Sequence, residues 1–154
     1  SYTRVLLRAA QALELPVVVT EQYPRGLGPT VAPLLEVLGD VSPIEKLVFD
    51  ACRAESFVSA LKAQQKSQVL LAGLETHICV LQTAAGLLHM GYRPWIISEA
   101  VASRSSDNWR AGLRLAEQLG AFVVPLETAL FLLCETAGTP DFKVVSQWVK
   151  ELPL

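Results

Sequence analysis

The sequence has few of the features that mark several large classes of protein. Its 154 residues contain no apolar run approaching the ~18 residues that a membrane-spanning helix needs, and no signal peptide is visible at the start. The net charge of −2 comes without a cluster of lysines and arginines, so a nucleic-acid partner is not expected. Two histidines and three cysteines show no metal-ligand spacing, and no Gly-x-Gly-x-x-Gly follows a predicted strand. We therefore expect neither a metal nor another cofactor.

The composition is that of a folded protein with a substantial core. Half of the residues (51%) are hydrophobic and 18% are charged, which excludes a disordered chain. The length fits a single domain over residues 1–154. An odd number of cysteines suits a reducing compartment, so a cytoplasmic location is expected. The slightly high hydrophobic fraction favours a homo-oligomer.

The chain alternates between short β-type runs and helical patterns. Helical spacing of apolar residues covers 1–13, 31–38, 54–61, 108–119 and 127–136, and Asp141 can cap a last helix. Between these stretches, strands are predicted to begin near Val17, Leu47, Val69, Trp95 and Ala121. This succession predicts an α/β fold with a mainly parallel, doubly wound sheet of the Rossmann-like type.

Residues 69–85 contain the strongest candidate for chemistry. An apolar run from Val69 ends at Gly73 and is followed by a helical pattern that begins around Cys79. The positive end of a helix dipole and its free N–H groups favour a thiolate and could receive an oxyanion. The position therefore suits a nucleophile, although Cys79 could also be a small buried residue at a strand–helix turn.

Three segments of the sequence resemble one family. Residues 73–84 (GLETHICVLQTA) are similar to the nucleophile segment of the isochorismatase-like cysteine hydrolases, in particular the "isochorismatase domain-containing" branch. Residues 20–31 (TEQYPRGLGPTV) and 102–106 (ASRSS) resemble the same branch, in the same order. The resemblance runs from about Leu6 to the C-terminus and implies a three-layer α/β/α fold.

The resemblance also assigns roles to particular residues. It implies that Cys79 is the nucleophile and that Lys46, which by itself looks like a surface lysine, holds the thiolate by charge. It implies a cis peptide bond at Leu74–Glu75, with an oxyanion hole formed near Glu75 and Cys79. The candidates for the substrate pocket are Glu21, Tyr23, Phe49, Thr76 and His77. A metal of the nicotinamidase type is not expected, because the loop at residues 21–24 contains no histidine.

One residue of the family pattern is missing. The resemblance implies a catalytic aspartate at the end of a first strand that precedes Val17, but no aspartate occurs before Asp40. Asp50 is too close to Lys46 and lies in the wrong motif to replace it. We therefore expect that the natural protein begins earlier, and that without the first strand the strands near Val17 and Val69 lack a shared neighbour.

Two functions remain open from the sequence. The first is a hydrolase that cleaves a small amide, ester or related bond through a cysteine nucleophile. The second is a non-catalytic oligomeric scaffold or binding protein that keeps the fold without the chemistry. The lysine and cysteine favour the first, and the absent aspartate favours the second.

Overall fold

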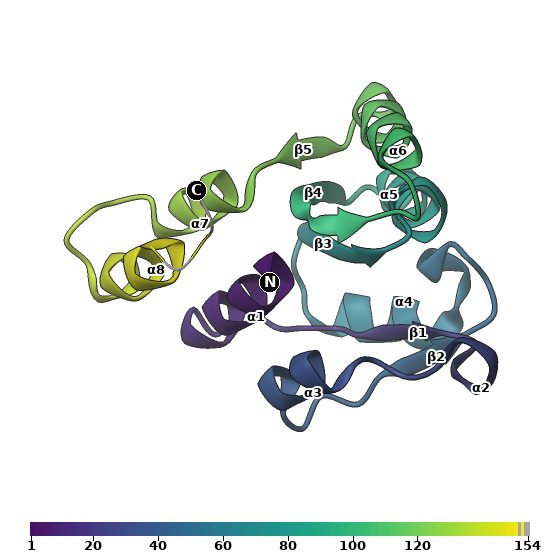
Figure 1. Cartoon of the computed structure of the whole chain (residues 1–154), viewed down its shortest axis with the longest axis horizontal. Coiled ribbons are helices and arrows are strands. Elements are labelled where there is room, and N and C mark those ends of the chain that lie inside the picture. Colours follow the sequence, from purple (N-terminus) through teal and green to yellow (C-terminus); the bar gives the residue numbers. More distant parts are fainter. Residues whose placement is uncertain (151, 153–154) are drawn as a thin grey trace.

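The computed structural model describes residues 1–150 and residue 152, and Figure 1 shows the arrangement of the elements. Helices alternate with short parallel strands, as the sequence predicts. In chain order the elements are α1 (Tyr2–Ala12), β1 (Thr20–Gln22), α2 (Pro24–Leu27), α3 (Ala32–Leu38), β2 (Ile44–Lys46), the 3₁₀ turn η1 (Ala51–Arg53), α4 (Glu55–Ala63), β3 (Gln68–Leu74), the π-helical turn η2 (Thr76–Val80), α5 (Leu81–His89), β4 (Arg93–Ala102), α6 (Ser106–Leu119), β5 (Phe122–Val124), α7 (Leu126–Cys134) and α8 (Pro140–Lys150).

The strands form two separate parallel groups within the described residues. β3, β4 and β5 make a three-stranded sheet with β4 in the middle, and its register shifts between Leu71 and Gly73. β1 and β2 make a two-stranded sheet in which Glu21 is opposite Glu45. Each of β1 and β3 therefore has one edge on which no described strand pairs with it.

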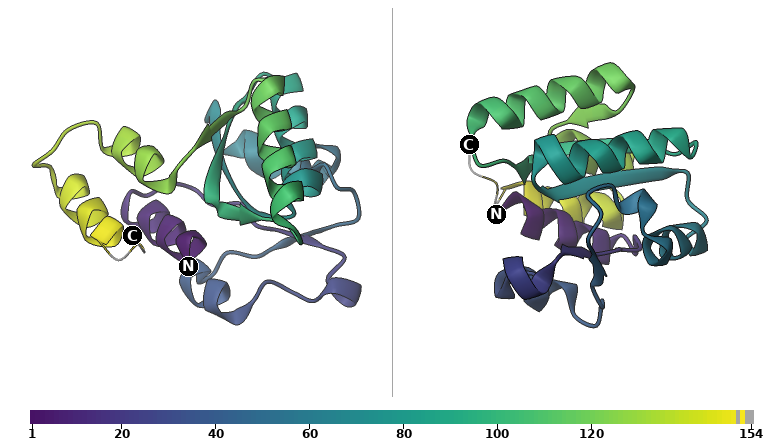
Figure 2. Two further views of the ribbon diagram at one scale, coloured as in Figure 1. Left: turned by 45° about the horizontal axis from the view of Figure 1, so that its top comes forward. Right: turned by 90° about the vertical axis from the view of Figure 1, so that its right-hand side faces the viewer.

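The larger sheet is the middle of three layers. Neighbouring side chains of a strand point to opposite faces, so Ile96 and Ile97 of β4, both fully buried, belong to two different cores. Ile97 packs with apolar residues of α1, α7 and α8, and Ile96 packs with those of α5 and α6. Figure 2 shows these two groups of helices on opposite sides of the sheet. The fold is therefore α/β/α.

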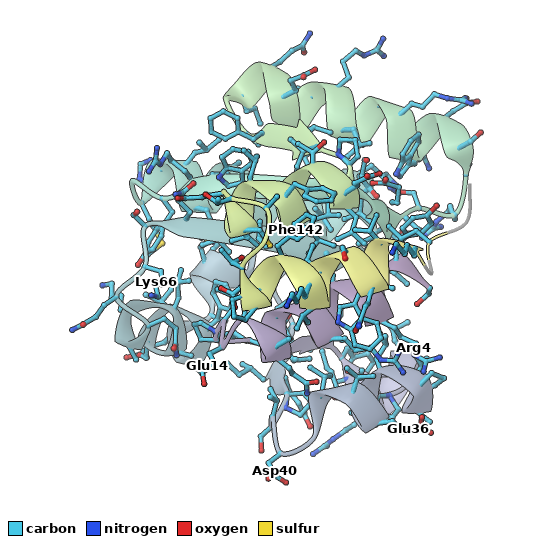
Figure 3. The ribbon with its side chains drawn as sticks, turned by 90° about the vertical axis from the view of Figure 1, so that its left-hand side faces the viewer. Arg4, Glu14, Glu36, Asp40, Lys66 and Phe142 are labelled. Atoms are coloured by element: carbon cyan, nitrogen blue, oxygen red, sulfur yellow. The ribbon has the colours of Figure 1, made fainter. Side chains whose placement is uncertain are left out.

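A third core connects the smaller sheet to the larger one. Leu87 of α5 is fully buried against Ala51 of η1 and against Phe57 and Leu61 of α4. At the other end of the molecule, α7 and α8 lie side by side, and their contact includes the rings of Phe131 and Phe142, whose centroids are 6.1 Å apart (Figure 3). None of the helices in the described residues is long and apolar enough to cross a membrane.

Three local predictions are wrong in detail. The strand expected from Val17 is confined to Thr20–Gln22, because upstream of it only the Val19 carbonyl is engaged, by the N–H of Ile44. A β-branched run becomes a strand only where a neighbouring strand can pair with it. The strand expected near Leu47 ends at Lys46, and the chain then bends.

The third correction concerns the last helix. The expected cap, Asp141, lies inside the first turn of α8, and the hydroxyl of Thr139 accepts the hydrogen bond from the N–H of Phe142. Thr139 is better placed because it precedes Pro140, which is the first helical residue and has no N–H to satisfy.

Candidate active site

Cys79 lies in the turn that connects the end of β3 to α5. The Leu74–Glu75 peptide bond is cis, at the position that the resemblance indicates. The backbone carbonyl of Glu75 then accepts hydrogen bonds from the N–H groups of Ile78 (3.1 Å) and Val80 (3.2 Å). These two donors flank Cys79, whose side chain is partly buried. The backbone of Glu75 therefore shapes the turn that presents the sulfur.

Hydrogen bonds connect the loop between β4 and α6 to the same turn. The Glu75 carboxylate accepts hydrogen bonds from the backbone N–H and the Nε of Arg104, and its second oxygen pairs with Nη2 at 3.0 Å. The Nδ1 of His77 lies 3.0 Å from the hydroxyl oxygen of Ser103. We call residues 75–80 the nucleophile turn, after the predicted role of Cys79. Two of its side chains thus contact two consecutive residues of this loop.

The packing of α6 against the turn depends on one glycine. A Cβ at Gly112 would lie 2.9 Å from both the Cα and the backbone nitrogen of His77, and 3.0 Å from the carbonyl carbon of Thr76. Only a residue without a side chain allows this approach. Thr76 is fully buried at this contact, and its hydroxyl has no hydrogen-bond partner among the described residues.

The Glu75 carboxylate gives the turn a pH dependence. Its hydrogen bonds with the Arg104 side chain lower the pKa of Glu75 below its ordinary value of 4.5, and the charges of Arg104 and His77 act in the same direction against an opposing effect of desolvation. A carboxyl group whose pKa falls on folding adds stability above its unfolded pKa and loses it as the pH drops through the folded value. We expect Glu75→Gln to lower the melting temperature at neutral pH, and the difference from the wild type to vanish in acid.

Thermal unfolding of both proteins across a pH series measures this effect. Asp107→Asn is the matched control, because its ion pair with Arg110 (3.0 Å) is exposed and lies away from the turn. A melting-temperature difference for Glu75→Gln that stays constant into strong acid would contradict the expectation.

Lys46 is the second predicted catalytic residue, and it is buried with only 6% of its surface exposed. Its Nζ donates to the side-chain oxygen of Gln22 (2.6 Å) and to the backbone carbonyls of Val48 (3.0 Å) and Phe49 (3.2 Å). Within the described residues, none of these acceptors is a carboxylate. The positive charge of a buried ammonium with only neutral partners is not neutralised, so such a group can bind an anion favourably.

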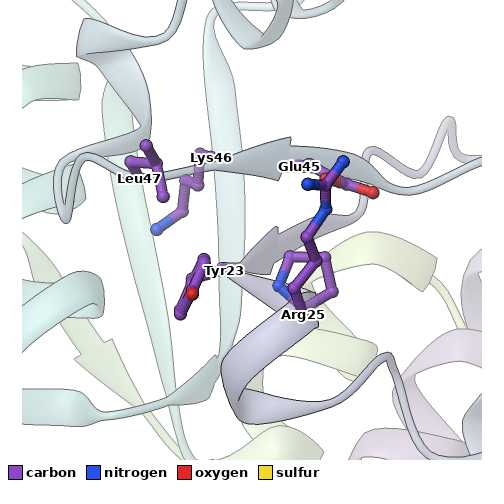
Figure 4. A pocket seen from close by; sticks show the side chains of 6 residues that line it. Tyr23, Arg25, Glu45, Lys46 and Leu47 are labelled. Carbon is purple, nitrogen blue, oxygen red and sulfur yellow. The ribbon is translucent and has the colours of Figure 1, made fainter.

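A pocket of about 320 Å³ opens beside Lys46, and Figure 4 shows its lining. Tyr23, half exposed, stands next to the lysine in this pocket. Glu21 does not line it: its carboxylate accepts a hydrogen bond from the N–H of Thr30 (2.6 Å) and so holds the loop after β1. The lining residues are Tyr23, Pro24, Arg25, Glu45, Lys46 and Leu47.

The structure joins the two halves of the site indirectly. Cys79 is not among the residues that line the pocket of Lys46. The link is made by the segment that follows Lys46, because the N–H of Ala51 donates to the hydroxyl of Thr83 (3.0 Å), one turn beyond Cys79 on α5. Phe49 lies between them on the chain and is half exposed.

The other two cysteines differ from Cys79 in their surroundings. Burial, followed by the charge and the hydrogen bond of Asp50, raises the pKa of Cys52 to about 12. Burial and the charge of Asp141 raise the pKa of Cys134. Both shifts favour the protonated thiol, so we expect these two cysteines to react more slowly than an ordinary thiol. Residues 1–150 and 152 contain no group of three acidic, histidine or cysteine side chains that could hold a metal ion.

Several residues of the site were not assigned a role from the sequence. Ser103 and Arg104 belong to a motif that carried the resemblance, but only helix capping was expected there, and Ser105 does cap α6 by accepting from the N–H of Asn108. Gly112 and Gln22 gave no signal, because their partners lie far away in the sequence.

Comparison with known proteins places the chain among relatives of one kind. The isochorismatase domain family matches residues 1–128. The secreted isochorismatase effector Isc1 of Phytophthora sojae is 39% identical over 155 residues, which cover 97% of this chain and 73% of that protein. Isochorismatase domain-containing protein 2A of Mus musculus is 38% identical, covering 95% and 69%. A solved structure described as MAR1 ribonuclease from Caenorhabditis elegans superposes with a TM-score of 0.90 at 35% identity, covering 99% and 82%.

Proposed function

The chain belongs to the isochorismatase family, and from that premise we propose that it is a cysteine hydrolase acting on a small amide, ester or related substrate. The observation that carries the proposal is the place of Cys79, in the first turn after the carboxyl end of parallel strand β3. Ligands of open α/β sheets bind at the carboxyl ends of the strands. The N–H groups of a first helical turn stabilise negative charge there.

The proposed reaction has two steps. The Cys79 thiolate attacks the carbonyl carbon of the substrate, a C–S bond forms, and backbone N–H groups near Glu75 and Cys79 receive the negative oxygen. The C–N or C–O bond then breaks, and the leaving group takes a proton. Water hydrolyses the thioester in the second step, which releases the acid and restores the thiol.

The reaction needs an acid–base group that residues 1–150 do not supply at the expected place. The proposal includes a further strand that lies between β1 and β3 and carries a carboxylate next to Lys46. Two observations support it: β1 and β3 each lack a described neighbour on one edge, and the buried Lys46 ammonium has only neutral partners. For residues 1–154 alone we expect little or no turnover.

Alkylation of the three cysteines by iodoacetamide tests the nucleophile. We expect Cys79 to be alkylated faster than the other two cysteines across the pH series, because the N–H groups of the helical turn stabilise negative charge on its sulfur. Cys52 and Cys134 should react slowly, because their surroundings raise their pKa values. Mass spectrometry of peptides from the folded protein, over a pH series, gives the three rates in one sample. A rate for Cys79 no higher than that of Cys134 would contradict the hydrolase and favour the non-catalytic scaffold.

RNA is a second candidate substrate, favoured by the C. elegans relative that is described as a ribonuclease. The two candidates differ in their need for the thiol, because RNA can be cleaved by its own 2′-hydroxyl group. Cys79→Ser should abolish hydrolysis of amides and esters, and it should leave a ribonuclease activity of that kind in place.

The cytoplasmic location stays a prediction, since the Phytophthora relative is named a secreted effector. The homo-oligomer also stays a prediction.

A further inference from the structure

Arg104 binds the nucleophile turn through the carboxylate of Glu75. Its Nε and backbone N–H both donate to Oε1 of Glu75, at 3.1 and 3.0 Å, and its Nη2 donates to Oε2 at 3.0 Å. Two parallel bonds from a planar guanidinium to a carboxylate fix the orientation of both groups. The third bond, from the backbone, ties the whole β4–α6 loop to Glu75 and not only the end of a long side chain.

Glu75 transmits this contact to the residues around Cys79. Its carboxylate holds Arg104, and its backbone carbonyl accepts the N–H groups of Ile78 and Val80, on either side of the cysteine. A shift of Glu75 therefore changes the hydrogen bonds that set the position of the sulfur.

The loop that carries Arg104 is itself held firmly. Ser105 caps α6 through the N–H of Asn108 (3.2 Å), and α6 packs at Gly112 against the backbone of His77. Ser103 adds the hydrogen-bond contact to the ring of His77. Arg104 therefore directly precedes a helix that packs against the nucleophile turn. This packing limits the movement of Arg104 relative to Glu75.

We propose that Arg104 is a positioning residue, which clamps Glu75 so that the turn holds Cys79 in its reactive position. The inference rests on the proposed function, in which Cys79 is the nucleophile. The clamp also balances charge, because without Arg104 the Glu75 carboxylate would oppose formation of a thiolate in the same turn. The Arg104 side chain is 73% exposed, which limits what the pair contributes to stability, so the effect is expected on reactivity more than on unfolding.

The test compares Arg104→Ala with a matched control, Arg110→Ala in the neighbouring helix α6. Arg110 has a similar exposure (66%, against 73% for Arg104) and an ion pair with Asp107 at the same distance of 3.0 Å, and this ion pair involves no residue of the turn. The readouts are the rate of iodoacetamide alkylation at Cys79 over a pH series, hydrogen exchange of the Ile78 and Val80 amides, and the melting temperature.

We expect Arg104→Ala to slow alkylation of Cys79 at neutral pH about tenfold and to speed exchange at both amides. Arg104→Lys should restore only part of the rate, since a single ammonium cannot make the paired contact. Arg110→Ala should leave both readouts unchanged. Equal rates for the two alanine variants, or a lower melting temperature with unchanged alkylation and exchange, would overturn the proposal.

A double variant tests whether Arg104 and Glu75 affect Cys79 through one shared contact or independently of each other. If Arg104 acts through Glu75, then Glu75→Gln combined with Arg104→Ala should slow Cys79 no more than the worse single variant does. Multiplicative losses would overturn the proposal. The failure of the hydrolase itself has a different signature, which is a wild-type Cys79 no faster than Cys134. In that case exchange at Ile78 and Val80 still decides whether the clamp exists.

Discussion

Replacing Lys46 by alanine is expected to lower the free energy of unfolding by about 2–3 kcal/mol. The side chain is buried, and alanine removes three methylene groups at about 0.8 kcal/mol each. The substitution also removes the donor that links Gln22 of β1 to the carbonyls of Val48 and Phe49 after β2. Chemical denaturation measures the change. An alanine variant as stable as the wild type would contradict the burial of this lysine.

Lys46→Met separates the methylene chain from its charge. Methionine keeps the length of the side chain but has no charge. The variant therefore loses the stability that three hydrogen bonds contribute, and it no longer bears the cost of burying an ammonium without a described carboxylate partner. These effects oppose each other, and we expect a stability within about 1 kcal/mol of the wild type. Lys66 is exposed (Figure 3), so Lys66→Ala is the surface control and should leave the free energy of unfolding unchanged. A methionine variant more stable than the wild type would indicate that the charge is kept for binding or chemistry.

Gly112→Ala is expected to lower the free energy of unfolding by about 2 kcal/mol and to slow the alkylation of Cys79. The new methyl group would lie under 3.0 Å from the backbone of His77, and backbone atoms cannot turn aside. Overpacking of this kind costs about 3 kcal/mol, and the higher helix propensity of alanine offsets about 1 kcal/mol. Either α6 or the nucleophile turn must move, and a movement of the turn displaces the sulfur.

Gly86→Ala is the comparison that isolates the backbone clash. A Cβ at Gly86 would lie 2.6 and 2.7 Å from the carboxylate oxygens of Asp50 and 2.9 Å from the Cβ of Cys52. The carboxylate can rotate away by giving up its hydrogen bond from the N–H of Cys52 (2.8 Å), and only the Cβ of Cys52 is fixed by its backbone. We therefore expect a smaller loss of stability and a smaller effect on Cys79 than for Gly112→Ala. Denaturation curves and alkylation rates of both variants check this order. A Gly86 variant with the larger loss would show that side-chain freedom does not decide the outcome.

The parts of the site that follow from local sequence were predicted well. The place of Cys79 in the turn after β3 agrees with the sequence, because a strand, a turn and a helix in succession place their residues through short-range geometry. The cis bond at Leu74–Glu75 agrees with what the family resemblance implies. The helices from α3 to α7 begin and end within a few residues of the predicted ranges for the same reason. Apolar spacing, glycines and capping hydroxyls are all readable within a few turns of chain.

Two features of the structure depend on partners that the local sequence does not contain. Val17 and Val18 have strand composition, yet no described strand pairs with them. Lys46 reads as a surface residue by its type, and its burial follows from three acceptors, of which Gln22 is 24 residues away. Strand pairing and charge burial are decided between elements, so a window of neighbouring residues cannot report them.

The sequence alone determined the alternation of strands and helices and the position of a cysteine after the carboxyl end of a predicted parallel strand. Each of these depends on the period of the chain and on residues a few positions apart. Only the tertiary structure decided which residues surround that cysteine. Arg104 meets Glu75 across 29 residues because β3 and β4 end side by side, and Gly112 meets His77 because α6 returns over the turn. Those contacts are set by sheet register and helix packing, which are properties of the assembled fold.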